Sequence, residues 1–575
     1  MSPTKTVSPS ERVAIGISFG NANGSIAVTV DDKAEVIANE DGGYAATAQN
    51  PDLMIADRQI PAVLSYVDGE EYYGQQAKAF FVRNPKNTVG YFRDFLGKEF
   101  KNIDPTHNHA SAHPEDAASG VAFSIQDKEG DDKSTVPVSE IATRYLKRIA
   151  TAASDYLGKT VTSAVISVPT NSSDKQKEAL IKAANDAGLE ILQLIADPVA
   201  SVLAYDARPG AEVKDKIIVV ADLGCTRSDV SVVASRGGMY TVLATAHDYE
   251  FAGVQLDQVL IDHFAKEFIK KHQKDPRTTE RSLAKLKLEA EACKKALSLG
   301  TNASFSVESL IDGIDFASTI NRLRFEMLGR KVFDGFSRLV EGVVTKAGLD
   351  VLDVDEVIMS GGTSHIPRIA NNMASLFPES TAIQAPATEP TAVNPSELQA
   401  RGAALQASLI QEYEQEDVEQ STHAAVTTVN HISNAIGVVS VDAAGKEVFT
   451  PIIVPETAVP ARRTVHLAAP AAGGSVLVKI AEGNTHINVT KPEPKAKPEK
   501  AADDEDSDED SDDDEEEDLR EKVWKVGNTL AEAAIKDVKK GSKIEVSVTV
   551  AADLTVVFIV REVGSKTGVR GSISA

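Results

Sequence analysis

Two segments of this chain share one design, an apolar strand that runs into a glycine turn. Residues 13–25 read VAIGISFGNANGS, and residues 219–229 read VVADLGCTRSD. Glycine at such a turn lets backbone N–H groups approach phosphate oxygens closely, because no Cβ stands in the way. The repeated design predicts two copies of one fold that face each other across a phosphate.

Both turns also carry residues that do not suit phosphate cleavage. Ser18 stands where a carboxylate would help to hold a metal ion. Cys225, Thr226 and Arg227 stand where a phosphate loop favours small residues. The pattern therefore predicts a site that binds a nucleotide and is poorly equipped to cleave it.

The bulk composition limits the class of protein. With 575 residues the chain is too long for one hydrophobic core, so we expect two or more domains. Its net charge is −25, and we expect no direct contact with nucleic acid, since phosphate contacts need clustered Lys and Arg. Two cysteines and the lack of a long apolar run predict a reducing compartment, no disulfide framework and no membrane contact.

The pattern along the chain divides it into four parts. Residues 1–11 are expected to be disordered, and strands and helices alternate over 12–411, which indicates an α/β domain with two related halves. Residues 412–423 are acidic, lack an apolar face and are interpreted as a linker. Residues 424–575 have the short β-branched runs of a β domain, with a disordered acidic insertion at 491–518.

The insertion and the segment after it carry two further expectations. Within 503–518 every residue except Ser507 and Ser511 is acidic. We interpret the insertion as a solubilising loop, with contact to a basic partner surface or phosphorylation of the two serines as the alternatives. The segment 519–540 is expected to be helical.

The segment 282–298 predicts an amphipathic helix. Its polar side holds Glu291, Lys294, Lys295 and Ser298. This face could be a solvated, salt-bridged surface, or it could hold a ribose. A strand and a glycine turn at 360–367 favour the interpretation that this face holds a ribose, because a purine would fit between that turn and the helix. His365 in this turn is by itself more typical of a surface or structural histidine than of a ligand.

Further motifs in the same order identify a family resemblance. They are VIANEDGG (36–43), NPKNTVGYFRDFLG (84–97), ISVPTNSSDKQ (166–176), ADPVASVLAY (196–205), DGIDFASTINRLRFE (312–326) and NPSELQARGAALQA (394–407). With the glycine turns and the helix, they resemble the heat shock protein 70 chaperones over nearly all of 12–411, and more weakly beyond. The resemblance implies an actin-like ATPase domain, a duplicated RNase H-like fold, followed by a β-sandwich substrate-binding-like domain.

The hydrolytic positions of that family are mostly changed here. In the family two aspartates hold magnesium through water, a glutamate assists, and a lysine positions the attacking water. The matching residues are Ser18 and Asp222 for the aspartates, Asp197 for the glutamate and Arg93 for the lysine. Phosphoryl transfer depends on positioning, and Arg is a planar fork rather than a point charge. The resemblance implies ATP as the ligand, very weak or absent ATPase activity, and at most a degenerate magnesium site at Asp222.

The nucleotide-binding positions are better kept. The resemblance implies phosphate contacts from Gly20, Asn21, Ala22, Gly224, Cys225, Thr226 and Arg227. It implies nucleoside contacts from Glu291, Lys294, Lys295, Ser298, Gly361, Gly362, Thr363, His365 and Ser396. His365 stands where the family usually has an arginine that stacks on the base, and Ser396 where an aspartate is usual. We hypothesise that Arg227 neutralises phosphate and so partly replaces the metal.

The C-terminal half departs from the family as well. The family's linker is apolar and docks on the ATPase domain, which the acidic 412–423 stretch is not expected to do, and the β domain is expected to lack the helical lid. These departures resemble the atypical fungal branch of the family that works in the ribosome-associated complex.

The resemblance to this branch implies a cytoplasmic, ribosome-associated co-chaperone scaffold. It would form a stable heterodimer with a zuotin-like J-domain protein and reach the ribosome through that partner. There it would assist a second heat shock protein 70 chaperone that folds nascent chains. The alternatives are an active ATP-dependent peptide-binding chaperone and an actin-fold sugar kinase, and the choice between ATP and ADP stays open.

Overall fold

The computed structural model describes residues 12–31, 33–37, 58–104, 111–118, 120–130, 132–212, 214–422, 430–441, 447–470, 472–490, 519–565 and 567–574. The predictions for 1–11 and for the insertion 491–518 lie outside these ranges. The chain divides into two compact units, Met1–Val426 and Thr427–Ala575. We call them unit 1 and unit 2 and describe each by itself.

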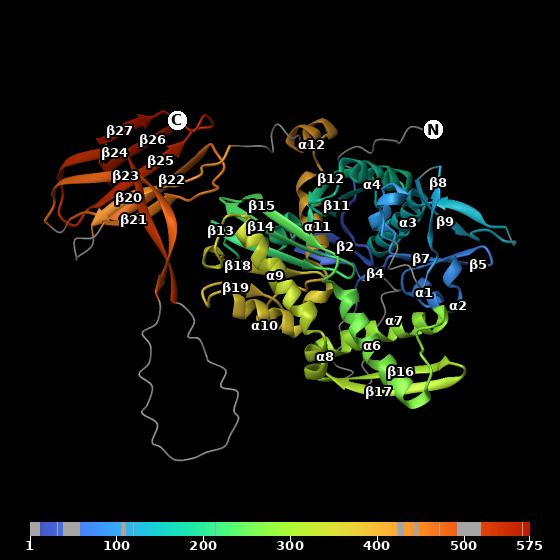
Figure 1. The fold of residues 1–575 in the computed structure, drawn as a ribbon. Helices are drawn as coiled ribbons and strands as arrows, with labels where there is room; N and C mark the ends of the chain where they lie inside the picture. Colours follow the sequence, from blue (N-terminus) through green and yellow to red (C-terminus); the bar gives the residue numbers. More distant parts are fainter. Residues whose placement is uncertain are drawn as a thin grey trace, which may run out of the picture. The chain divides into compact units, whose positions relative to one another are not determined.

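The first lobe of unit 1 is built on a mixed sheet with the order β12-β11-β1-β2-β3, and β4 also pairs with β2 (Figure 1). The strands are β1 (Ala14–Phe19), β2 (Asn23–Val30), β3 (Lys33–Val36), β4 (Ile60–Pro61), β11 (Ser163–Val168) and β12 (Glu190–Ala196). Strand β1 pairs antiparallel with β2 and parallel with β11. Alternate residues of β1 therefore point to opposite faces, with Ile15 and Ile17 towards one core and Ala14 towards another.

Helices cover both faces of this first sheet. Helices α3 (Val138–Leu157) and α4 (Asp174–Asp186) lie over one face, and α11 (Leu398–Ile410) packs on the other against β1, β2 and β11. The approach of α11 is close, because a Cβ on Gly16 would lie 2.1 Å from the backbone nitrogen of Ala404. Ser173 caps α4, and Gly158 ends α3 in the left-handed conformation.

The second lobe repeats the plan of the first. Its sheet has the order β15-β14-β13-β18-β19, and its central strand β13 pairs antiparallel with β14 and parallel with β18. The strands are β13 (Lys216–Leu223), β14 (Ser228–Arg236), β15 (Met239–Asp248), β18 (Glu356–Ser360) and β19 (Ala382–Gln384). Its larger helices are α6 (Gly253–His272), α9 (Arg330–Lys346) and α10 (Pro367–Leu376). This repeat confirms the duplicated α/β fold class.

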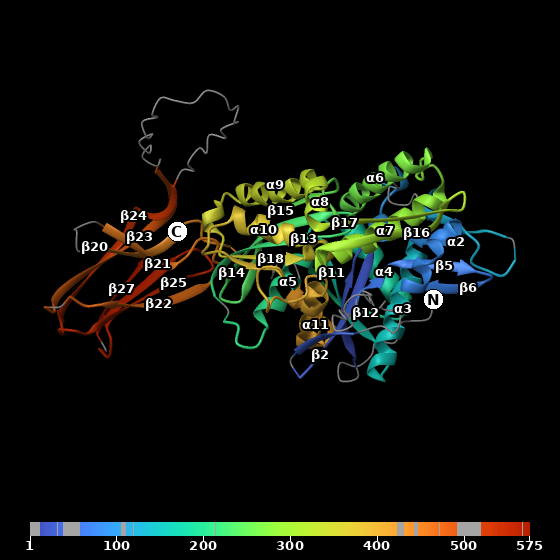
Figure 2. The same ribbon diagram turned by 90° about the horizontal axis from the view of Figure 1, so that it is seen from below.

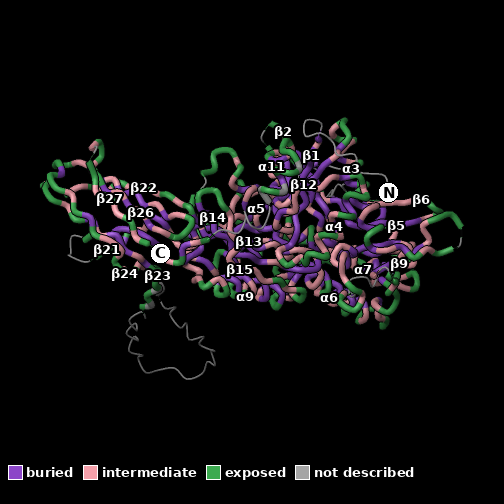
Figure 3. Tube along the Cα trace, turned by 90° about the horizontal axis from the view of Figure 1, so that it is seen from above, coloured by how far each residue is buried: buried purple, intermediate pink, exposed green. Residues whose placement is uncertain are grey.

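The helices α5 (Asp197–Asp206) and α11 join the two lobes. They pack against each other, and α5 also packs on β13 while α11 packs on β1 (Figure 2). Figure 3 shows that the buried residues follow the central strands of both lobes, including β1 and β13. The glycine turns that follow these two strands are thus carried on the most buried elements of unit 1.

Further elements extend both lobes. In the first lobe they are β5 (Val63–Val67), β6 (Glu70–Tyr73), α1 (Gly74–Lys78), α2 (Phe80–Arg83), β7 (Thr88–Gly90), β8 (Pro114–Ala117), β9 (Gly120–Ile125) and β10 (Ser134–Pro137). In the second lobe they are α7 (Glu280–Leu299), β16 (Asn302–Ile311), β17 (Ile314–Asn321) and α8 (Arg322–Leu328). Helix α7 contains the whole of the predicted helix 282–298. Among the described residues, no helix has the length and apolar character that a membrane crossing requires.

The acidic stretch after α11 differs from its prediction as an unpacked linker. Residues Gln415–Thr422 form helix α12, which contacts β12. Val418 is 1% exposed and belongs to the same apolar cluster as β12. Arg12 pairs with Glu190 at 3.2 Å and donates to the carbonyl oxygen of Tyr413, so both ends of unit 1 are fixed together. One apolar side chain and one arginine are sufficient to dock a segment that is otherwise acidic.

Unit 2 contains two four-stranded sheets around one apolar core. The first has the order β21-β20-β23-β24, from β20 (Ala435–Val441), β21 (Glu447–Ile453), β23 (Gly474–Thr490) and β24 (Leu519–Val538). The second has the order β22-β25-β26-β27, from β22 (Ala461–Ala468), β25 (Lys543–Val550), β26 (Val556–Glu562) and β27 (Gly568–Ile573). The described part of unit 2 contains strands and no helix.

The predicted helix 519–540 is wrong. This segment forms β24, which pairs antiparallel with β23 from Thr490↔Leu519 to Gly474↔Val538. Ala533 is buried in the core of unit 2, and Ile535 is partly buried there. Pairing with a long neighbouring strand and burial against the second sheet override the local propensity for helix.

Candidate functional site

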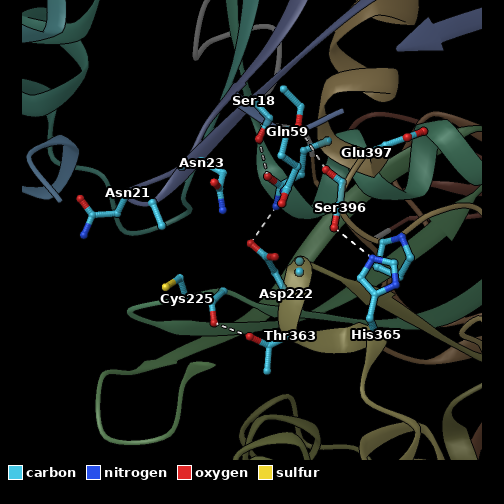
Figure 4. A pocket seen from close by; sticks show the side chains of 18 of the residues that line it. Ser18, Asn21, Asn23, Gln59, Asp222, Cys225, Thr363, His365, Ser396 and Glu397 are labelled. Atoms are coloured by element: carbon cyan, nitrogen blue, oxygen red, sulfur yellow. Dashed lines mark hydrogen bonds between the residues drawn. The ribbon is translucent and has the colours of Figure 1, made fainter. Parts of the chain in front are cut away.

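A pocket between the two lobes of unit 1 brings together every residue that the sequence predicted for nucleotide binding or hydrolysis, and Figure 4 shows part of its lining. Its lining includes both glycine turns, the polar side of α7 and the turn after β18. The positions predicted for hydrolysis, Ser18, Arg93, Asp197 and Asp222, lie in the same pocket. The sequence did not single out other lining residues, among them Arg58, Gln59, Asn23, Asp229, Glu397 and Gln399.

The two glycine turns have the same geometry. The N–H of Gly20 donates to the carbonyl oxygen of Asn23 at 3.0 Å, and the N–H of Gly224 donates to that of Arg227 at 2.9 Å. A Cβ on Gly20 would lie 2.5 Å from the acceptor oxygen of its turn, and one on Gly224 would lie 2.6 Å from its own. Neither turn tolerates a side chain at these positions, which explains why both copies of the motif use glycine.

Gln399 connects the two strands that carry these turns. Ser18 donates its hydroxyl to Gln399 Oε1 at 2.8 Å, and Gln399 Nε2 donates to Asp222 Oδ2 at 2.7 Å (Figure 4). These are the two positions where the family's aspartates would hold magnesium. Carboxylate oxygens are the protein ligands that magnesium favours, and here one position is a hydroxyl and both are engaged by an amide. The described residues contain no cluster of three His, Cys, Asp or Glu side chains that could hold a metal ion.

Asp197, Asp222 and Asp229 all line the pocket, and their charges affect one another's ionisation. Burial raises the pKa of Asp197, and the nearby charge of Asp222 raises it further. Burial likewise raises the pKa of Asp222, with Asp229 adding to the effect and Arg93 opposing it. The pKa values of Asp197 and Asp222 are therefore both raised above that of a free aspartate.

Arg227 is held by groups of its own lobe. Its Nε donates to Asp229 Oδ2 at 2.7 Å, and its Nη1 donates to the hydroxyl of Tyr249 at 3.2 Å. The guanidinium also lies over the ring of Tyr249, 5.7 Å from the ring centroid. The side chain is 9% exposed and still lines the pocket. Its neutralisation of a phosphate remains a prediction, because its charge is already balanced by a carboxylate.

The polar side of α7 is not simply a solvated surface. Lys294 is buried, with its Nζ 2.8 Å from Asp257 Oδ2 and 3.0 Å from the carbonyl oxygen of Gly253. Glu291 accepts from Lys78 at 2.6 Å and lies 3.3 Å from Lys295. Burial opposes the ionisation of Glu291, but these lysines outweigh it and lower its pKa. Lys294 is therefore buried rather than solvated, whereas Glu291 and Lys295 form a partly exposed ion pair that is compatible with either alternative.

The turn after β18 completes the pocket. Gly361 has a φ of 82°, which favours glycine, and a Cβ there would lie 2.4 Å from the carbonyl oxygen of Leu223. Thr363 donates to the carbonyl oxygen of Gly224 at 2.8 Å. The ring Nε2 of His365 lies 3.0 Å from the hydroxyl oxygen of Ser396 (Figure 4). The two nucleoside-binding positions that differ from the family's usual residues therefore contact each other.

Comparisons with known proteins agree with this geometry. The family described as Hsp70 protein matches residues 14–490. A heat shock protein 70 homolog of Schizosaccharomyces pombe is 40% identical over 98% of this chain and 96% of its own length. The ribosome-associated complex subunit SSZ1 of Saccharomyces cerevisiae is 39% identical over 97% of this chain and 99% of its own. Heat shock 70 kDa protein 14 of Danio rerio is 31% identical over 81% of this chain and 88% of its own.

Proposed function

This chain belongs to the heat shock protein 70 family, and from that premise we propose that it is a co-chaperone scaffold that binds ATP and hydrolyses little or none of it. The observation that carries the proposal is the bridge from Ser18 through Gln399 to Asp222. An enzyme of this family needs those two positions free to hold the water-bound metal. Here their hydrogen-bonding groups are used to connect the strands.

The other departures support the same proposal. Asp197 is one methylene shorter than the family's glutamate, and Arg93 carries a planar guanidinium in place of a lysine. Each change displaces a charge that phosphoryl transfer requires in a fixed position, so their effects on the rate multiply. The glycine turns and the polar side of α7 keep the shape that cradles phosphates and a nucleoside. Binding is thus retained where cleavage is lost.

We further propose the partners that follow from the similarity to the ribosome-associated complex subunit of S. cerevisiae. The chain would form a stable heterodimer with a zuotin-like J-domain protein and reach cytoplasmic ribosomes through it. There it would assist a second heat shock protein 70 chaperone. In unit 2, β21, β24, β22 and β27 end the two sheets, and a segment of the partner could pair with such an end strand.

An active peptide-folding ATPase is the alternative, and a single-turnover assay separates the two. The full chain is mixed with radiolabelled ATP and magnesium beside an ordinary heat shock protein 70. The proposal expects stable nucleotide binding and a hydrolysis rate at the level of buffer alone. Hydrolysis at the rate of the ordinary chaperone would refute it. Purification from cells, with identification of bound protein and nucleotide, tests the partner separately.

A further inference from the structure

The two lobes of unit 1 are connected across the pocket by side chains of the chain itself. Gln399 is the second residue of α11, a helix that packs on the first sheet. Its partner Ser18 belongs to β1 of the same lobe, and its other partner Asp222 belongs to β13 of the second lobe. The amide of Gln399 therefore spans the boundary between the lobes.

The orientation of this amide is fixed at both ends. Oε1 can only accept and Nε2 can only donate, so Ser18 must supply a hydroxyl and Asp222 must supply an oxygen. An ionised aspartate at position 18 has no proton to donate and would face Oε1 with a second acceptor. The serine at position 18, where the family has an aspartate, is thus compatible with the hydrogen bond to Gln399.

A second bridge joins the two glycine turns. Asn21 Nδ2 donates to Thr226 Oγ1 at 3.1 Å, and Asn21 Oδ1 accepts from the backbone N–H of Asp94 at 3.3 Å. Asn21 is 7% exposed and Thr226 is 3% exposed. Separation of the lobes would break a buried pair of polar groups, which is costly until water reaches both of them.

We propose that the bridges Ser18–Gln399–Asp222 and Asn21–Thr226 hold the two lobes closed without nucleotide, with Gln399 as the residue that positions them. In this arrangement the chain supplies the cross-lobe contacts that a bound nucleotide would otherwise make. The shape of unit 1 is then constant, whether or not the pocket is filled. The inference depends on the lobe geometry and holds at any rate of ATP hydrolysis.

Hydrogen exchange of the full chain, stripped of nucleotide and then supplied with ATP, tests this inference. In the wild-type chain, the amides of residues 199–206 in α5, which packs against α11 at the boundary between the lobes, are expected to exchange at rates that ATP changes by less than about twofold. In Gln399→Leu, the same amides are expected to exchange about tenfold faster without nucleotide, since a bond to a charged acceptor is lost, and ATP should restore protection.

A matched control lies on the same helix. Gln406 Nε2 donates to Gln193 Oε1 at 2.7 Å within the first lobe, so Gln406→Leu removes a similar bond that does not cross the pocket. Its exchange in residues 199–206 should equal that of the wild type. Asn21→Ala, at the other bridge, serves if Gln399→Leu does not fold.

Two results would overturn the inference. The first is a nucleotide-free wild-type chain in which residues 199–206 exchange rapidly and are slowed tenfold or more by ATP. The second is a Gln399→Leu chain that exchanges like Gln406→Leu. ATP hydrolysis is measured in the same samples. Rapid ATP hydrolysis, together with hydrogen exchange that ATP does not change, would refute the proposed function and leave this inference intact.

Discussion

The buried pair Lys294–Asp257 offers a test of how α7 is fixed beside the pocket. The two side chains are 10% and 12% exposed, and Lys294 also donates to the carbonyl oxygen of Gly253 at the start of α6. Lys294→Met keeps the apolar stem and removes the charge. It leaves the Asp257 carboxylate buried without its ammonium partner, a loss of about 3–5 kcal/mol.

The expected shift in melting temperature follows from the size of unit 1. A unit of about 400 residues has an unfolding entropy of roughly 0.8 kcal/mol/K, so Lys294→Met should lower the melting temperature by about 4–6 °C. The double variant Lys294→Met/Asp257→Leu replaces the pair with apolar groups and should recover most of that loss. Lys271→Met, in the exposed pair with Glu267, should shift the melting temperature by less than about 1 °C.

Thermal unfolding followed by the helical circular dichroism signal is the assay, because all described helices lie in unit 1. The deficit of Lys294→Met should also shrink at lower pH. Burial raises the pKa of Asp257, and Lys294 opposes that rise. Without the lysine the folded-state pKa rises further above the unfolded value, so lowering the pH stabilises the variant relative to the wild type. A melting temperature within 1 °C of the wild type would refute this reasoning, as would a double variant no more stable than the single one.

Three further predictions concern other parts of unit 1. Val418→Asp should detach α12 from β12 and expose the 411–422 backbone to rapid proteolysis, since the side chain is 1% exposed in the wild type; unchanged cleavage would contradict the docking. Burial raises the pKa of the Cys225 thiol to about 11, so its alkylation rate should rise steadily with pH up to that value and fall when ATP is bound; a rate that levels off near neutral pH would be incompatible. Arg227→Ala should weaken ATP binding by about tenfold, with little response to magnesium, if the guanidinium reaches the phosphates; calorimetry that gives an unchanged affinity would end that hypothesis.

Features with a local signal could be predicted from the sequence. The glycine turns are recognisable in the sequence because a Cβ would collide with the backbone of the same turn. The apolar periodicity of α7 is likewise visible over several helical turns. Gln399 could not be found in this way, because its partners are 381 and 177 residues away in the sequence. Its position beside the candidate nucleoside residues in 394–407 was the one available signal.

The errors have a common physical origin. In β24 the composition favours helix, and only the pairing with β23 makes the segment a strand. The segment that forms α12 is acidic, but it contains one apolar residue, Val418, that packs into a hydrophobic cluster. Long-range pairing and a single buried contact decided these two elements, and neither is encoded in a local pattern.

The position of α11 has a consequence for the synthesis of the chain. The polypeptide passes from the first lobe into the second at α5 and returns to the first only with α11, which covers the second face of β1. Strand β1, which is synthesised first, therefore stays uncovered on this face until α11 is synthesised almost four hundred residues later. During synthesis on the ribosome, the second lobe can complete its core while the first still exposes apolar surface, so a heat shock protein 70 chain of this design itself needs protection as it emerges.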